Sequence, residues 1–170
     1  AWAHSKEFVR LSVKVGNRAL EELARGNLGH LCDLLGDHAS ARTYIEQSLR
    51  ICREIEAPYN ESRAFLYLAM ASQCQGQHDD ARSLAKQALH LARRVGAMDT
   101  VTWALHYLGA ALMDMGDLDA ARAAYEDSLA LARSPETLAG LAGTALAQGD
   151  LGQAQSRVAE NASGDCSACL

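Results

Sequence analysis

The chain of 170 residues contains 49% hydrophobic and 22% charged residues, with two prolines and five cysteines. This composition excludes collagen-like, disordered and disulfide-rich proteins. Its formal net charge of −5 argues against a nucleic-acid-binding surface across the whole domain, because phosphate neutralisation needs clustered Lys and Arg. Alanine makes up about a fifth of the residues, which favours a mostly helical protein.

The N-terminal segment lacks both the apolar core of a signal peptide and a starting Met, so we expect a segment of a longer polypeptide. No run of about eighteen apolar residues occurs, so no membrane span is predicted. Cys32, Cys52 and Cys74 lie inside helical patterns. An odd cysteine total without a secretory signal predicts reduced thiols and a cytoplasmic protein.

A repeat with a spacing of 40, 40 and then 33 residues runs through the chain. In each unit a Leu is followed by Gly or Ala, a glycine comes seven residues later, and an Ala five residues after that. The columns are Leu28, Leu68, Leu108 and Leu141; Gly36, Gly76, Gly116 and Gly149; and Ala41, Ala81, Ala121 and Ala154. Ala1 falls in the alanine column, so the chain begins in the middle of a unit.

Each unit predicts two antiparallel helices, because apolar residues recur at i, i+3, i+4 and i+7 before each glycine. The glycine can end the first helix with a positive φ, and Asp37, Asp117 and Asp150 can cap the second. We expect an array over residues 1–162, made of half a repeat (1–16), repeats at 18–56, 58–96 and 98–134, and a terminal repeat (136–162). The expected helices cover residues 2–15, 18–35, 38–55, 59–75, 78–95, 98–115, 118–133, 136–148 and 151–162.

Residues 163–170 are expected to form a loose C-terminal tail. Cys166 and Cys169 have the spacing of half a zinc knuckle, but such a site needs four ligands and no second pair exists. The histidines do not pair at metal-ligand spacing, and His38 and His78 are interpreted as solvent-exposed residues near turns. We therefore predict no metal and no cofactor.

The repeated signature resembles the tetratricopeptide repeat, with a large residue four positions after the alanine at Ile45, Tyr125 and Val158. Arg25 departs from it, because the family prefers a large apolar residue there, and Ala85 replaces the bulky residue of the second helix. The 40-residue spacing resembles the extended units of large bacterial transcription regulators and spindle-orientation scaffolds, and 13 Arg against 3 Lys favours a bacterium. The resemblance implies an all-α, right-handed superhelical solenoid of about nine helices, whose first helices line a concave inner surface.

A groove-facing row is predicted two, six, nine and thirteen positions into each unit. This row is unusually apolar for a solvated face, and its Tyr, Trp, Met and Arg residues are the types enriched at binding hot spots. We therefore predict a non-catalytic module that binds a peptide or partner helix, without direct contact to nucleic acid or membrane. The predicted groove residues are Leu23, Asn27, His30, Arg63, Tyr67, Met70, Trp103, His106 and Tyr107.

Other interpretations stay open. The aromatic side chains can pack against one another, or further repeats or a second copy can cover them. The groove can sense an inducer or signalling peptide for an attached domain, or the first helix, with Phe8, Leu11 and Val15, can mediate self-association. A carboxylate clamp is disfavoured because Asn27 and Arg63 are its only candidate donors.

No catalytic constellation is found in the sequence. The segment from Gly140 to Gly143 lies inside a predicted helix and lacks the Lys of a phosphate loop. The pairs Glu21-Glu22 and Asp79-Asp80 are interpreted as surface charge and helix-start preference rather than as acid–base pairs. The sequence therefore predicts a protein that is not an enzyme.

Overall fold

A computed structural model describes the backbone of residues 2–166 and the side chains of residues 3–162. Within this part of the chain the secondary structure consists of nine α-helices. They are α1 (Trp2–Val15), α2 (Arg18–Leu34), α3 (His38–Glu54), α4 (Pro58–Cys74), α5 (His78–Val95), α6 (Met98–Asp114), α7 (Leu118–Leu131), α8 (Pro135–Ala147) and α9 (Leu151–Cys166). The predicted all-α repeat fold is thereby confirmed.

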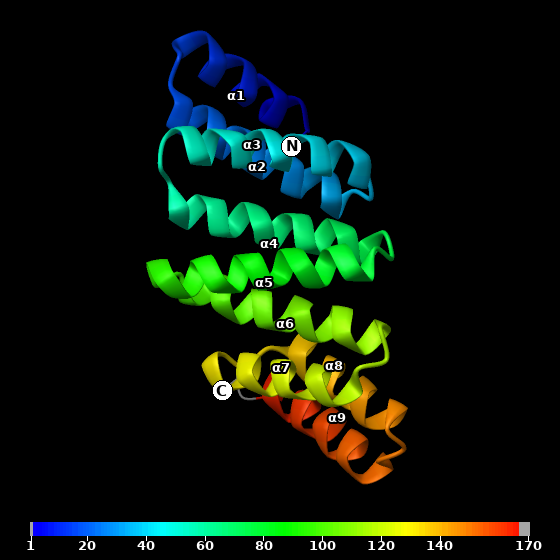
Figure 1. The fold of residues 1–170 in the computed structure, drawn as a ribbon. Coiled ribbons are helices and arrows are strands. Elements are labelled where there is room, and N and C mark those ends of the chain that lie inside the picture. The colour runs from blue at the N-terminus through cyan, green and yellow to red at the C-terminus, as the bar shows by residue number, and fades with distance from the viewer. Residues whose placement is uncertain (1, 167–170) are drawn as a thin grey trace.

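The helices stack as antiparallel hairpins in chain order, from α1 at one end to α9 at the other (Figure 1). Each helix contacts the next, and the first helices of adjacent hairpins also touch, in the pairs α2–α4, α4–α6 and α6–α8. In the described part of the chain, the second helices α3, α5 and α7 make no such contacts with one another. First helices that lie closer together than second helices form the inner, concave side of a curved stack.

The turns within the hairpins have the chemistry that the repeat predicts. Gly36 and Gly116 have φ values of 79° and 82°, in the left-handed region that favours glycine. The Asp37 and Asp117 side chains then accept hydrogen bonds from the backbone N–H groups of Ser40 and Ala120 at 3.1 and 3.3 Å. These caps fix where α3 and α7 begin.

Small residues on the first helices make room for large residues on the second. A Cβ atom added to Gly29 would lie 2.6 Å from Ile45 Cγ1, and one added to Gly109 would lie 2.9 Å from the Tyr125 ring. In the middle repeat, where Ala85 replaces the bulky residue, the first helix carries Ala69 at the position of these glycines. Both alanines are fully buried. The middle repeat thus has two small residues at this pair of positions, where the neighbouring repeats have a glycine and a large residue, and both combinations keep the two helices closely packed.

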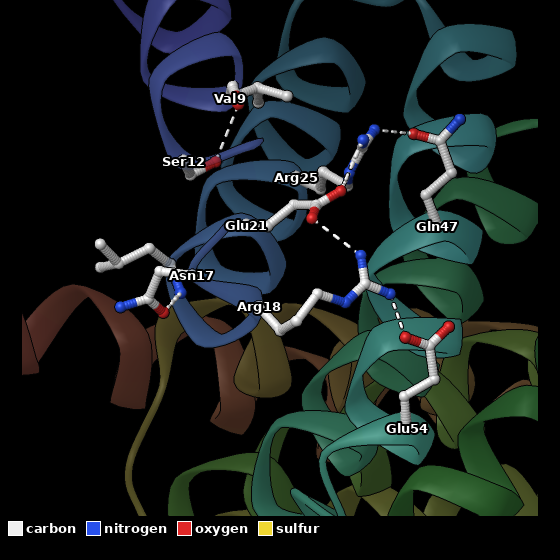
Figure 2. Close-up of polar contacts among 9 residues, drawn as sticks. Val9, Ser12, Asn17, Arg18, Glu21, Arg25, Gln47 and Glu54 are labelled. Atoms are coloured by element: carbon white, nitrogen blue, oxygen red, sulfur yellow. Dashed lines mark hydrogen bonds and ion pairs between the residues drawn. The ribbon is translucent and has the colours of Figure 1, made fainter. Parts of the chain in front are cut away.

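Arg25 is accommodated at a position where the repeat elsewhere buries an apolar side chain. Figure 2 shows it between α2 and α3, where it donates hydrogen bonds to Glu21 and to Gln47. The other oxygen of Glu21 accepts from Arg18, which also pairs with Glu54 (Figure 2). A network of charged groups on α2 and α3 therefore replaces an apolar contact.

Glu21 and Glu22 are both buried, so their interpretation as surface charge is wrong. Glu21 belongs to the network around Arg25. Glu22 accepts hydrogen bonds from Ser48 Oγ at 3.0 Å and from Asn60 Nδ2 at 2.7 Å, and it thereby links α2 to α3 and α4. Sequence periodicity missed the burial of Glu22 because its two partners, Ser48 and Asn60, come from other helices.

The helices near the C-terminus, α7 to α9, differ from their expected bounds. α7 ends at Leu131, and Ser134 caps α8 by accepting from Thr137 N at 3.2 Å. α9 continues to Cys166, beyond the expected end at residue 162, and Cys169 lies outside the described residues. Among the described residues, no helix combines the length and the apolar character needed to cross a membrane.

Candidate functional site

The inner face of the stack is hollowed between α2, α4 and α6. A pocket of about 410 Å³ opens there. Its lining combines apolar, aromatic and charged side chains from three consecutive first helices. The lining residues are His30, Arg63, Leu66, Tyr67, Met70, Asp99, Thr100, Trp103 and Tyr107.

Tyr67 on α4 forms the central wall of this pocket. The ring of His30 on α2 stacks on it, with the centroids 4.7 Å apart and the planes 10° from parallel. Arg63, one turn before Tyr67 on α4, lies 5.7 Å from the centre of the same ring and donates a hydrogen bond to its hydroxyl at 3.2 Å. These contacts hold Tyr67 in one orientation before any ligand binds.

Trp103 and Tyr107 form the wall on α6. Their ring centroids lie 6.3 Å apart at a tilt of 32°. Trp103 is 39% exposed, whereas Tyr107 is half-buried, and burial raises the pKa of Tyr107 to about 12. Tyr107 is therefore a neutral hydrogen-bonding group at physiological pH. The aromatic side chains do pack against one another, as one open interpretation held, but they leave a pocket open between them.

The charges around the pocket are sparse. Burial lowers the pKa of His30, and the nearby carboxylate of Asp33 offsets this only in part, so the imidazole is neutral at pH 7. Arg63 is the cationic group of the lining, and its hydrogen bond goes to the hydroxyl of Tyr67. The one carboxylate of the lining, Asp99, accepts from Tyr59 Oη at 3.4 Å.

Two polar atoms of the lining residues have no hydrogen-bond partner among the described residues. They are the hydroxyl of Thr100, which is 1% exposed, and Nδ1 of His30. An unpaired buried polar group is costly and is rare in native structures.

The structure brings together six of the nine predicted groove residues, which are His30, Arg63, Tyr67, Met70, Trp103 and Tyr107. Leu23 and Asn27 are exposed and line a small separate hollow next to Arg63 and Tyr67. His106 lies outside the pocket, since it points toward α8 and Nδ1 is 3.2 Å from Thr137 Oγ1. It has the register position of Leu66, which faces the following first helix in the same way.

Leu66, Asp99 and Thr100 also line the pocket but were not predicted. Leu66 directly precedes Tyr67 on α4. Its position in the repeat is one that faces a neighbouring helix rather than the groove. Asp99 and Thr100 lie in the first turn of α6, ahead of the row that starts at Trp103. A register extended by one turn toward the start of each first helix would have included Asp99.

Comparison with known proteins identifies the fold. The tetratricopeptide repeat family model matches residues 20–94 and 60–134, and a second model of the same repeat matches residues 135–160. The chain belongs to the tetratricopeptide repeat family. No curated protein matches the chain.

Several solved structures share this fold at low sequence identity. BtubC from P. vanneervenii is 21% identical with a TM-score of 0.77; the alignment covers 89% of this chain and 65% of BtubC. A Rap protein complexed with Competence and Sporulation Factor is 15% identical with a TM-score of 0.84, covering 94% of this chain and 46% of Rap. A putative kinesin light chain repeat structure from Podosopora anserina is 19% identical with a TM-score of 0.73, covering 94% and 82%. The chain thus spans less than two thirds of the first two structures.

Proposed function

We propose that the inner face of this tetratricopeptide array binds an extended peptide or a partner helix, without catalysing a reaction. The observation that carries the proposal is the pocket between α2, α4 and α6, where a Trp, two Tyr and a Met converge. Proteins of this repeat family are in general protein–protein interaction modules. Aromatic residues held in place by their neighbours are also the usual anchors of a binding surface.

The lining also indicates the chemistry of the ligand. Trp103, Tyr67 and Met70 suit a large apolar or aromatic side chain, which would be removed from water in the pocket. Arg63 suits a carboxylate beside that anchor, because its described hydrogen bond goes to the hydroxyl of Tyr67 and not to a carboxylate. We therefore expect a motif with an aromatic or large aliphatic residue next to Asp or Glu.

The array is proposed to be part of a larger bacterial regulatory protein. The structural similarity to a Rap protein, which was solved complexed with Competence and Sporulation Factor, supports a regulatory setting, and the match covers 46% of that protein. In this setting ligand binding alters contacts with an attached domain only if it stabilises one conformation more than another. The sequence of the parent open reading frame tests this assignment: a regulatory effector domain in the same chain would support it, and the absence of one would contradict it.

Selection of a random peptide phage library on the immobilised protein tests the binding function. Enriched peptides should share the apolar–acidic motif and shift the emission of Trp103, measured in a Trp2→Phe variant in which Trp103 is the single tryptophan. Trp103→Ala should weaken binding of labelled peptide, measured by anisotropy, by about tenfold or more.

The matched control is Leu131→Ala, which removes a similarly exposed apolar side chain (46%) from the second helix α7. This variant should bind as the unmodified protein does, and both variants should keep the helical circular dichroism signal. Failure to enrich any peptide would contradict the proposal, and so would equal affinity of the Trp103→Ala variant.

A second candidate function is self-association through α1. Phe8, Leu11 and Val15 on this helix are 38%, 43% and 72% exposed, which is a large apolar area for one short helix. Sedimentation velocity should show a dimer that Leu11→Asp dissociates. A monomer at all protein concentrations would exclude this function and leave the groove proposal untouched.

A further inference from the structure

Three side chains with metal-binding atoms meet where α2, α3 and α4 come together. Asp33 lies in the last turn of α2, His38 is the first residue of α3, and Cys74 is the last residue of α4. One oxygen, one nitrogen and one sulfur atom from these residues all lie within 4.8 Å of one another. Nδ1 of His38 is 2.7 Å from Oδ1 of Asp33, whose side chain is only 6% exposed.

The three groups provide the donor atoms of a borderline-soft transition metal site. Zinc binds thiolate, imidazole and carboxylate at about 2.0–2.3 Å in a tetrahedron, so its ligand atoms lie about 3.3–3.8 Å apart. The three donor atoms, which lie within 4.8 Å of one another, are therefore near the separations that one ion requires. Hard cations such as Mg²⁺ and Ca²⁺ are disfavoured, because they prefer all-oxygen ligands.

We propose that Asp33, His38 and Cys74 bind one divalent transition metal ion of the Zn²⁺ class, with the fourth position open to solvent or to a ligand. Cys74 is exposed, so an ion can reach the site without unfolding. The hydrogen bond between Asp33 and His38 already holds these two side chains together, and an ion bound by both atoms would replace the shared proton.

The equivalent junction in the next repeat shows how specific this combination is. The residues at the positions of Asp33, His38 and Cys74 are there Gln73, His78 and Asp114. Gln73 donates a hydrogen bond to Asp114, and His78 Nδ1 lies 3.4 Å from the same carboxylate. That junction has the histidine and a carboxylate but no thiol, so it serves as an internal control.

A nucleophilic role for the same residues is less well supported. An activated cysteine needs a lowered pKa, whereas burial and the nearby Asp33 carboxylate raise the pKa of Cys74. The site does lie close to the groove, because Asp33 follows His30 by three residues on α2 and Cys74 follows Met70 by four residues on α4, about one helical turn in each case. A bound ion would therefore add positive charge beside the aromatic pocket.

Cobalt titration tests the proposal directly. The protein should carry no affinity tag and should have Cys166 and Cys169 replaced by Ser, so that the C-terminal cysteine pair does not contribute. Co²⁺ should bind with one equivalent and produce thiolate-to-cobalt charge-transfer absorption, and Zn²⁺ should displace it. Cys74→Ser should abolish the charge-transfer band, and both Cys74→Ser and His38→Asn should raise the dissociation constant by at least about tenfold.

His78→Asn is the matched control and should bind Co²⁺ as the parent does. A second measurement needs no change at the site: Zn²⁺ should slow the alkylation of Cys74 by iodoacetamide, followed by mass spectrometry, while a chelator restores it. A cobalt spectrum without a thiolate band, equal affinity of the Cys74→Ser variant, or alkylation of Cys74 that is indifferent to Zn²⁺ would each overturn the proposal.

Discussion

Tyr125 is the largest fully buried side chain in the described part of the molecule, and a glycine on α8 makes space for it. A Cβ atom added to Gly140 would lie 2.5 Å from Tyr125 Cζ, which no real contact allows. Gly140→Ala should therefore lower the free energy of unfolding by about 1–3 kcal/mol, because the overpacking outweighs the gain in helix propensity. Urea denaturation followed by circular dichroism measures the change.

Gly143 on the same helix provides the control for this prediction. A Cβ atom there would meet only Met113 Sδ at 3.7 Å, an ordinary contact. Gly143→Ala should leave the protein equally stable or more stable by up to about 1 kcal/mol, since alanine is the better helix former. Equal effects of the two substitutions would show that the Tyr125 ring is not tightly confined.

Glu21 makes a testable contribution to stability through its charge. Burial raises the pKa of this carboxyl, but the hydrogen bonds from Arg25 and Arg18 lower it more, so the pKa in the folded protein lies below its ordinary value of 4.5. The ionised form therefore stabilises the fold above pH 4.5, and this stabilisation is lost as the pH falls through the folded pKa.

Glu21→Gln should accordingly be less stable than the parent at pH 7, and the difference should shrink as the pH falls from about 6 to 3. Urea midpoints of the two proteins across this range provide the measurement. A stability difference that does not change with pH would mean that the carboxylate charge contributes nothing at this position.

At the scale of elements, the turns between repeats contain one irregular position. Gly16 and Gly96 have φ near 70°, and Glu56 has the same register with φ 52°. A residue with a Cβ atom is strained in this left-handed region by roughly 1–2 kcal/mol. Glu56→Gly should therefore raise the free energy of unfolding by about 0.5–1 kcal/mol, after the entropy cost of glycine is subtracted.

Glu56→Ala separates this backbone effect from the loss of the side chain. Alanine keeps the Cβ atom, so it should leave stability near that of the parent, and thermal unfolding of the three proteins gives the comparison. Equal stabilisation by Ala and Gly would assign the effect to the Glu side chain rather than to the backbone.

The element boundaries were predictable because they depend on local chemistry. Gly36 with Asp37, and Gly116 with Asp117, end one helix and cap the next using interactions within a few residues of the chain. The position of His106 was not predictable in the same way. His106 contacts Thr137 on α8, and the packing between hairpins decides that this side of α6 meets α8.

At the scale of the whole molecule, the register of the repeat predicted much of the candidate groove. His30, Tyr67 and Trp103 hold different positions in the repeat register, but these positions share one face of the first helix, and that face turns toward the inner side of the stack. The junction of Asp33, His38 and Cys74 was not predicted, since Cys74 comes from the next repeat, 36 residues after His38 and 41 after Asp33. Nothing in the local spacing of these residues resembles a metal motif.

The proposed function of the groove depends on the curvature of the stack. Contacts between α2, α4 and α6 on one side, with none between α3, α5 and α7 in the described residues, leave an inner wall that a ligand can span. Hydrogen–deuterium exchange with and without a library-selected peptide tests this most directly. Binding should slow exchange in α2, α4 and α6 while leaving α3, α5 and α7 unchanged. Protection confined to the second helices or to α1 would contradict the account.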